Sequence, residues 1–283
     1  MREKCCGKAG EQTMSEQRFA FGKNWKRYLT GVGRDEIDAA KRSLSAAIQN
    51  IQPGQATFLD IGSGSGLFSR AAYEFGFCRV ASFDYDLDSV EATVAMKQMA
   101  GATDTRWSVL QGSVLDTGFM QTLGLHDVVY SWGVLHHTGS MWHALDNAAR
   151  AVKPNGRLFI ALYNDQGWIS KYWHAIKRTY VSAPGFIRLL MLLVFWIYFG
   201  VGLFVADLLR LRNPLKRHTG DARGMKFFTD VIDWVGGYPF EVATPGRVEE
   251  YLRGQGFTLT WQRLAGRRHG CNEFVFRRAE AHD

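Results

Sequence analysis

The chain has 283 residues, of which 46% are hydrophobic, 22% charged and 13% aromatic, a composition that excludes a disordered or fibrous protein. Its four cysteines contain no CxxC pair, so neither a zinc ribbon nor a disulfide scaffold is expected. The net charge of +7 is local, because residues 171–226 contain ten basic and two acidic residues. This distribution predicts a basic surface patch and not a protein that coats nucleic acid. No apolar segment follows Met1, so we expect no signal peptide and a cytoplasmic location.

Short apolar runs alternate with segments of helical periodicity between residues 34 and 163. Helices are expected over 34–50, 67–75, 88–99 and 141–152, the third with Asp88 as its N-cap. Strands are expected over 56–61, 78–83, 107–110, 126–132 and 157–163. The residues Lys153-Pro154-Asn155-Gly156 predict a turn before the last of these strands. Continuous apolar strands alternating with helices indicate a parallel sheet that is covered on both faces.

After residue 163 the alternation stops for about 80 residues and then resumes. A helix is expected over 245–253, and two strands over 257–263 and 272–277 are joined closely enough to form an antiparallel pair. The predicted fold class is therefore α/β, a Rossmann-like doubly wound sheet that is mostly parallel with a C-terminal antiparallel hairpin. We divide the chain into an N-terminal tail and cap (1–54), a core (55–164), a helical insertion (165–243) and a last helix with hairpin (244–283).

The segment 58–66 (FLDIGSGSG) places a glycine-rich turn directly after the first strand. Such glycines let a ligand approach the backbone at the start of the following helix. Asp60 would repel a pyrophosphate but favour a cationic ligand. Asp84 follows 24 residues later at the end of the second strand, where it could hold ribose hydroxyls, and 112–114 (GSV) could lie along a purine. These groups suit a ligand with ribose, adenine and an ammonium group but no phosphate.

With these motifs, residues 56–163 and 244–277 resemble the class I S-adenosylmethionine-dependent methyltransferases. The resemblance implies S-adenosyl-L-methionine as the cofactor, S-adenosyl-L-homocysteine as its product, and no metal. It also implies a set of cofactor-binding residues: Asp60, Gly62, Ser63, Gly64, Asp84, Tyr85, Ser113, Val114, Ser131 and Trp132. A nucleotide-binding or non-catalytic α/β domain is the alternative.

The segment 131–137 (SWGVLHH) at the end of the fourth strand bears on the class of molecule that accepts the methyl group. It lacks the Asn/Asp-Pro-Pro-aromatic motif of base-modifying amino-methyltransferases, which disfavours a nucleic-acid substrate. Its Leu-His-His part instead resembles small-molecule methyltransferases, including C-methyltransferases of quinone synthesis. Together with 21–25, 161–167, 236–241 and 270–274, it resembles a bacterial subgroup from glycan and secondary-metabolite gene clusters.

Methyl transfer to a hydroxyl or a protonated amine requires removal of a proton, and histidine has a pKa suited to that task. We take His137 as the first candidate base and His136 as the second, the alternative being histidines that cap a helix or pack on the sheet. Residues near strand ends or in glycine-rich turns are candidates for binding the acceptor: Tyr163, Asn164, Tyr238 and Glu241, with Asp165, Asn272 and Glu273 as further members. Asn24 and Trp25 either close over the cofactor or pack.

The run 189–206 contains 18 residues without a charge, and as a helix it would span about 27 Å, close to the ~30 Å of a bilayer core. If this helix crossed the membrane once, the membrane would separate the last hairpin from the sheet that it must join. The alternatives left are a lid, core or homo-oligomer contact, docking on a membrane surface through 186–217, or a segment that dips in and returns.

The function expected from these patterns is transfer of a methyl group to an O or N atom of a small-molecule or lipid-linked metabolite, such as a glycan or natural-product intermediate. Quinone C-methylation at the membrane surface is the alternative within the same class. RNA methylation and a non-catalytic cofactor-binding module are less favoured alternatives. The expected location is cytoplasmic, with peripheral binding at the inner face of the membrane as an open alternative.

Overall fold

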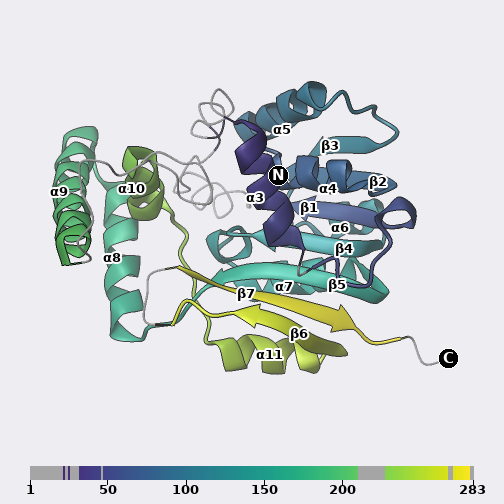
Figure 1. The fold of residues 1–283 in the computed structure, drawn as a ribbon. Coiled ribbons are helices and arrows are strands. Elements are labelled where there is room, and N and C mark those ends of the chain that lie inside the picture. The colour runs from purple at the N-terminus through teal and green to yellow at the C-terminus, as the bar shows by residue number, and fades with distance from the viewer. Residues whose placement is uncertain are drawn as a thin grey trace, which may run out of the picture.

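The computed structural model describes residues 22, 25, 32–45, 47–209, 227–266 and 270–280. One seven-stranded sheet forms its centre, with the strand order β3-β2-β1-β4-β5-β7-β6 (Figure 1). The strands are β1 (Thr57–Ile61), β2 (Arg79–Asp84), β3 (Trp107–Gln111), β4 (His126–Trp132), β5 (Val152–Tyr163), β6 (Phe257–Arg263) and β7 (Cys271–Arg278). The first five run parallel, while β7 lies antiparallel between β5 and β6. The predicted fold class is confirmed.

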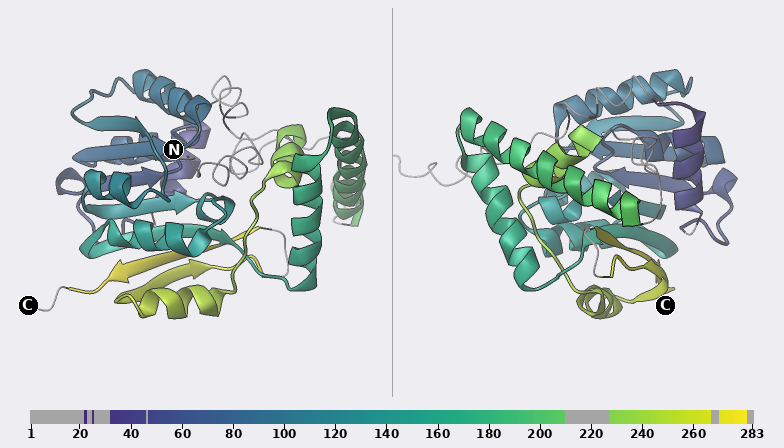
Figure 2. Two further views of the ribbon diagram at one scale, coloured as in Figure 1. Left: turned by 180° about the vertical axis from the view of Figure 1, so that it is seen from behind. Right: turned by 60° about the vertical axis from the view of Figure 1, so that its left-hand side comes forward.

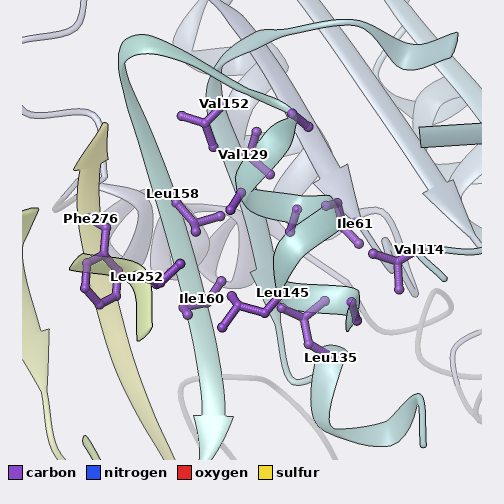
Figure 3. Packing of buried hydrophobic residues seen from close by; sticks show 14 of the residues in the cluster. Ile61, Val114, Val129, Leu135, Leu145, Val152, Leu158, Ile160, Leu252 and Phe276 are labelled. Carbon is purple, nitrogen blue, oxygen red and sulfur yellow. The ribbon is translucent and has the colours of Figure 1, made fainter. Parts of the chain in front are cut away.

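Helices cover both faces of the sheet. Helices α6 (Thr117–Leu123), α7 (Met141–Arg150) and α11 (Pro245–Arg253) pack in one apolar cluster, part of which Figure 3 shows around Leu145 and Ile160. Helices α3 (Arg34–Leu44), α4 (Leu67–Phe75) and α5 (Leu87–Met99) pack on the other face. Because both faces of the sheet are covered by helices, β1, β4 and β5 are rich in consecutive apolar residues. The layers leave the carboxyl ends of the parallel strands at one edge, where ligands of such folds bind.

The local structure differs from the sequence-based prediction in four places. The first helix ends at Leu44 and not at residue 50, since turns occupy most of the following residues. Asp86, and not Asp88, is the N-cap of α5, because its carboxylate accepts a hydrogen bond of 2.8 Å from the Asp88 N–H. The predicted turn at 153–156 lies inside β5, as an irregularity where Asn155 has a φ of 60°. Helix α6 was not predicted at all.

The insertion forms a helical unit of its own beside the carboxyl edge of the sheet. It contains α8 (Trp168–Ser182), α9 (Gly185–Leu209) and α10 (Phe227–Gly236), which share an apolar cluster around Tyr180 and Val235. Figure 1 and the left view of Figure 2 show α9 on the side of this unit that faces away from the sheet. Among the residues that the structure describes, no helix is both long and apolar enough to cross a membrane.

Candidate cofactor and acceptor site

The glycine loop lies between the end of β1 and the start of α4. Gly62 and Gly64 have φ values of 73° and 55°, in the left-handed region that favours glycine. A Cβ on Gly62 would lie 2.5 Å from side-chain carbons of Val134, so no side chain fits there. The N–H groups of Gly62 and Ser63 both donate to the Phe83 carbonyl, at 2.9 and 3.0 Å. These bonds fix the loop onto the end of β2.

Asp60 is buried and belongs to a hydrogen-bonded chain that crosses three strands. The Trp107 indole N–H donates to the Ser82 hydroxyl (2.8 Å), which lies 2.7 Å from the Ser69 hydroxyl, and Ser69 donates to Asp60 Oδ2 at 2.5 Å. Burial raises the pKa of Asp60 to about 7, with the charge of Asp84 adding to the rise and the Ser69 hydrogen bond opposing it. A carboxyl with this pKa changes its charge near neutrality, so a cationic ligand beside it would favour the ionised form.

Asp84 ends β2 and holds the loop from the other side. Its Oδ2 accepts from the Gly64 N–H at 2.9 Å, and its Oδ1 accepts from the Asp86 N–H at 3.0 Å. Burial raises the pKa of Asp84 to about 6. A carboxylate offers about four lone-pair positions, so Asp84 can keep both bonds and still accept from two hydroxyl groups.

The other predicted cofactor residues are divided between loop support and packing. Ser63 Oγ lies 2.9 Å from Thr93 Oγ1, and Thr93 donates to the Gly64 carbonyl at 3.2 Å, which ties the loop to α5. The Ser131 hydroxyl donates to the Ile61 carbonyl at 3.2 Å. The side chains of Ser63 and Ser131 therefore hold the loop, and any contact with the cofactor would involve their backbone groups or a change of partner.

Three further predicted residues flank this loop. Tyr85 is exposed beyond β2, and the Ser113 hydroxyl accepts from the Leu115 N–H at 3.2 Å. Val114 is buried in the core, and its carbonyl accepts from the Asn147 amide at 2.8 Å. Of the Ser113–Val114 pair, only Ser113 has a side chain that is partly open.

Trp132 at the end of β4 points toward the last strand pair. Its indole N–H donates to Glu273 Oε1 at 3.1 Å, and Arg263 donates to the same carboxylate oxygen. Glu273 is thus occupied in holding Trp132 and Arg263. This bond joins β4 to β7, two strands that are not neighbours in the sheet.

The N-terminal segment touches the cofactor loop. A Cβ on Gly64 would lie 3.1 Å from the Trp25 ring, which means that this ring lies against the loop. The Gly22 N–H donates to Asp86 Oδ2 at 3.1 Å, next to Asp84. Trp25 therefore packs against the loop, which is compatible with both roles considered for it in the sequence analysis. Asn24 lies outside the described residues.

The two histidines follow β4 in a single 3-10 turn but have different surroundings. Nδ1 of His137 lies 2.7 Å from the Pro239 carbonyl. Because a carbonyl only accepts, Nδ1 bears the proton in the neutral ring and Nε2 is the basic nitrogen. Burial, together with the positive charge of Lys177, lowers the pKa of His137 to about 3. Its neutral form therefore predominates across the physiological range.

His136 is fully buried, and neither ring nitrogen has a hydrogen-bond partner among the described residues. Burial, and then the charges of His137 and Lys177, hold its pKa well below the usual range. Its ring centroid lies 4.0 Å from that of Tyr163. This placement suits packing at the end of β5 and leaves His137 as the stronger candidate for a base.

Tyr163 is the centre of an aromatic cluster between the sheet and the insertion. Its ring centroid lies 5.1 Å from Phe240 and 5.5 Å from Trp234, and the ammonium of Lys177 lies 4.6 Å from the Trp234 ring centroid and donates to the Trp234 carbonyl. Beside this cluster is a small cavity with room for about one water molecule. Aromatic and uncharged polar side chains line it together with one glycine: Tyr163, Asn164, Gln166, Ser170, Trp173, Trp234, Phe240 and Gly270. The lining combines ring surfaces with polar side chains, but the cavity is far smaller than a small-molecule site.

The predicted acceptor residues are only partly brought together. Tyr163 and Asn164 line the cavity, and the Tyr238 ring lies 5.7 Å from His174 on α8. Glu241 instead accepts from the Met141 N–H at 3.0 Å, at the start of α7. A carboxylate is favourable at a helix N-terminus, so Glu241 acts as a cap supplied by a distant segment.

Asp165, Asn272 and Asn164 form turn and strand-end contacts. Asp165 accepts from the Gly167 N–H at 2.8 Å, and the Asn272 amide donates to Asn164 Oδ1 at 3.0 Å. The sequence analysis missed Ser82 and Trp107 in the Asp60 chain, as well as Thr93 and Lys177. Ser82 could have been found, because a polar residue inside an apolar strand faces its register partner, here Asp60.

The observed groups fit S-adenosylmethionine. The loop backbone at Gly62 and Gly64 is open to a close ligand, Asp60 is an acid that suits a cationic group, and Asp84 lies where a ribose would be held. Within the described ranges, no group of three or more His, Cys, Asp or Glu side chains is placed to hold a metal ion. The sheet order, the antiparallel last strands and this loop together define the fold of class I S-adenosylmethionine-dependent methyltransferases.

Comparison with known proteins leads to the same class. The family model for a methyltransferase domain matches residues 33–192, more than half of the chain. The chain therefore belongs to the methyltransferase domain family, and S-adenosylmethionine is the cofactor of its class.

Curated relatives match only part of their own length. The ribosomal protein L11 methyltransferase of Streptococcus pneumoniae is 28% identical over 162 residues, which is 55% of this chain and 45% of that protein. Squalestatin tetraketide synthase of a Phoma species is 31% identical over 113 residues, which is 37% of this chain and 4% of the synthase. The chain thus spans less than half of the length of these two relatives.

Solved structures share the fold at low sequence identity. Magnesium protoporphyrin IX methyltransferase from Synechocystis, solved with bound S-adenosylhomocysteine (SAH), has a TM-score of 0.56 at 13% identity, over 95% of this chain and 100% of that one. The PKMT2 structure from Rickettsia typhi, in complex with AdoHcy, has a TM-score of 0.55 at 14% identity, over 86% of this chain and 53% of that one. At these identities, the likeness extends to the fold.

Proposed function

We propose that this methyltransferase transfers the methyl group of S-adenosylmethionine to an O or N atom of a small or lipid-linked metabolite bound beside Tyr163. The observation that carries the proposal is the joint position of three features. Val134 contacts the glycine loop at Gly62, His136 and His137 follow it in the chain, and both histidine rings contact Tyr163 at the cavity. A short segment after β4 thus links the cofactor loop to the acceptor cavity.

The bound cofactor supplies a methyl group activated by its sulfonium. The protein positions the acceptor in line with this methyl group and excludes water. We assign His137 as the general base on its position: its Nδ1 proton is fixed on the Pro239 carbonyl, which leaves Nε2 to accept a proton, although the lowered pKa of about 3 makes it a weak base in the free protein. As the new C–O or C–N bond forms and the C–S bond breaks, the acceptor proton passes to Nε2, and SAH is the product.

The surroundings of the cavity favour an acceptor with an aromatic or otherwise apolar part. Tyr163, Trp173, Trp234 and Phe240 provide ring surfaces, while Asn164, Gln166 and Ser170 provide hydrogen-bonding groups. The relative named as a tetraketide synthase supports a natural-product type of acceptor. The cavity, which has room for about one water molecule, must widen for any such acceptor.

A methyl-labelling experiment tests this proposal. Purified protein is incubated with S-adenosylmethionine labelled in the methyl group and with bacterial extract divided into lipid, aqueous small-molecule, protein and RNA fractions. We expect label in the lipid or small-molecule fraction, and none when Asp84→Ala replaces the wild type. Label in ribonuclease-sensitive material or in protein would contradict the proposed acceptor class. A C-methylated product would replace O- or N-transfer by the quinone-type alternative.

The proposed setting is the cytoplasm, at or near the inner face of the membrane. The exposed apolar surface of helix α9 supports a position at the membrane.

A further inference from the structure

Helix α9 exposes an unbroken apolar stripe. Between residues 186 and 201, the strongly exposed apolar and tyrosine side chains follow the 3–4 spacing of one helical face: Phe186, Leu189, Leu190, Leu193, Val194, Ile197, Tyr198 and Val201. The opposite face of α9, which includes Leu192, packs against α8 and α10. Both faces of α9 are therefore apolar, and the described residues cover only one of them.

The length and continuity of the stripe distinguish it from scattered surface leucines. It runs for about 22 Å along the helix, at 1.5 Å per residue. Ile197 near its middle is 66% exposed. Contiguous apolar surface of this kind is rare on proteins that stay in water and marks a contact with a partner or a membrane.

In the described part of the insertion from residue 166 to residue 206, all charged side chains are basic. Residues 166–206 contain no Asp or Glu, and Lys171, Arg178 and Arg188 are exposed there. Arg188 lies in the first turn of α9, where its guanidinium donates to the carbonyls of Ala183 and Val181 at 2.7 and 2.6 Å. The sequence 210–226, outside the described residues, adds six basic residues and one acid. An anionic surface complements these charges, whereas a second copy of the chain would bring like charges together.

The stripe is also connected to the proposed acceptor site. Helices α8 and α10, which support α9 from behind, supply the cavity residues Ser170, Trp173 and Trp234. Figures 1 and 2 show this helical unit standing beside the carboxyl edge of the sheet, with α9 on its outer side. A surface bound by α9 would therefore lie one helical layer away from the cavity.

We propose that the stripe of α9 docks the protein on a lipid bilayer that contains anionic headgroups, with the helix lying along the interface. The apolar side chains enter the boundary between headgroups and acyl chains, and the adjoining basic residues meet lipid phosphates. Docking does not carry the chain across, because β7, which follows the insertion, pairs with β5, which precedes it, and β6 pairs with β7. The inference deepens the proposed function and rests on it in one respect: the acceptor reaches the cavity from the membrane.

Vesicle flotation tests the docking directly. The full chain is mixed with vesicles of phosphatidylcholine alone or of phosphatidylcholine with phosphatidylglycerol, and the bound fraction is measured at low and at high salt. We expect binding to the mixed vesicles that high salt weakens. Leu190→Glu and Ile197→Glu should each lower the partition coefficient by about 10-fold or more, since binding of an interfacial helix scales with its buried apolar area.

A matched control uses an exposed leucine elsewhere on the molecule. Leu125 is 51% exposed in the connection between α6 and β4, compared with 62% for Leu190. Leu125→Glu should bind vesicles as the wild type does. Circular dichroism and SAH affinity are measured for each variant, so that loss of folding is distinguished from loss of docking.

Two results would overturn the inference. One is a wild type that binds SAH but does not float with mixed vesicles, and the other is equal flotation of Leu190→Glu and Leu125→Glu. If sedimentation shows a dimer that Leu190→Glu dissociates, and flotation is absent, the stripe belongs to a second copy. A wild type that binds no SAH under any condition would overturn the proposed function, which is a separate outcome.

Discussion

The Ser69 hydroxyl donates a 2.5 Å hydrogen bond to Asp60 Oδ2, and both side chains are buried. The bond joins the first turn of α4 to the end of β1, across the glycine loop. Through Ser82 and Trp107 it continues to β3, so three strands and a helix act together on one carboxylate. Asp60 is thereby held in a fixed orientation, and its charge depends on residues that do not approach the cofactor.

The Ser69→Ala variant should bind S-adenosylmethionine about 10-fold more weakly at neutral pH. Without the hydroxyl the carboxylate loses a donor that lowers its pKa, so the protonated form becomes more populated. Raising the pH should restore part of the affinity, which a purely structural defect would not allow. Calorimetric titration at several pH values measures the cofactor affinity. Ser108→Ala on β3 is the control, because Ser108 takes no part in the hydrogen bonds that lead from Trp107 to Asp60. Equal losses at all pH values would contradict the role of Ser69.

Cofactor affinity should rise with pH between about 5.5 and 8, by up to about 10-fold. The pKa of Asp84 is raised to about 6 and that of Asp60 to about 7, so both carboxyls ionise in this range. Their anionic forms favour the cationic cofactor. The Asp84→Asn variant should bind more weakly and show a flatter profile. A flat profile in the wild type would show that neither carboxyl titrates at the site.

The same carboxyls have the opposite effect on the free protein. A carboxyl with a raised folded-state pKa binds more protons folded than unfolded, so its contribution to stability falls as pH rises from about 4 to about 7. The histidines act in the other direction. His137, with a pKa lowered to about 3, destabilises the fold as pH falls from about 6.5 toward 3. Urea unfolding of His137→Gln at about pH 4.5 should therefore show a smaller loss relative to pH 7 than the wild type does.

The Gly62→Ala variant should lose more stability than Gly76→Ala, by about 1–3 kcal/mol. Both positions have positive φ values, 73° and 91°, so both substitutions introduce backbone strain. Only at Gly62 does the new Cβ meet Val134, whereas nothing lies within 4 Å at Gly76. Urea titration gives the two free energies of unfolding, and SAH affinity should fall for Gly62→Ala alone. Equal losses would mean that Val134 moves aside without cost.

The His137→Ala variant should lower turnover by about 100-fold or more while changing SAH affinity little. SAH affinity should be kept because His137 is assigned to the acceptor, and the hydrogen bonds of the glycine loop do not involve its side chain. His136→Ala is the control, since it should mainly lower stability by leaving space beside Tyr163. The pair is compared by kcat, KM and urea titration once an acceptor is known. Full turnover of His137→Ala would remove it as the base.

The Glu241→Ala variant distinguishes a helix cap from an acceptor contact. Because Glu241 accepts from the Met141 N–H, we expect a loss of about 1 kcal/mol in the free energy of unfolding. The KM for the acceptor should stay nearly constant. A raised KM with unchanged stability would return Glu241 to the acceptor site.

Local patterns in the sequence were sufficient for the fold and for the cofactor loop. The strands are continuous apolar runs, and the loop glycines, Asp60 and Asp84 occur at strand ends that periodicity locates within a few residues. The wrong predictions also concern local details. Asp86 and Asp88 are both plausible N-caps by sequence, and only the backbone geometry selects Asp86. The Lys153–Gly156 residues favour a turn, but they form an irregularity inside β5, because Val152 before them and Arg157 after them both pair with β4.

The acceptor side could not be predicted in the same way, because its contacts join residues far apart in the chain. Glu241 meets Met141 across 100 residues, and Trp132 meets Glu273 across 141. Lys177 is an ordinary basic residue by sequence, yet the fold buries its ammonium over the Trp234 ring. Nothing in the local pattern indicates such partners, since they depend on how the insertion packs against the end of β5.

The central position of β7 has a consequence for how the chain matures during synthesis. β7 lies between β5 and β6, so until β7 emerges from the ribosome β5 is paired only with β4 and β6 has no partner. Until then β5 is an open edge, and the apolar α9 is already outside the exit tunnel. The nascent chain thus passes through a stage with an unpaired strand and an uncovered helix. A lipid surface or a chaperone that receives α9 at this stage would shield the chain from aggregation before the sheet closes.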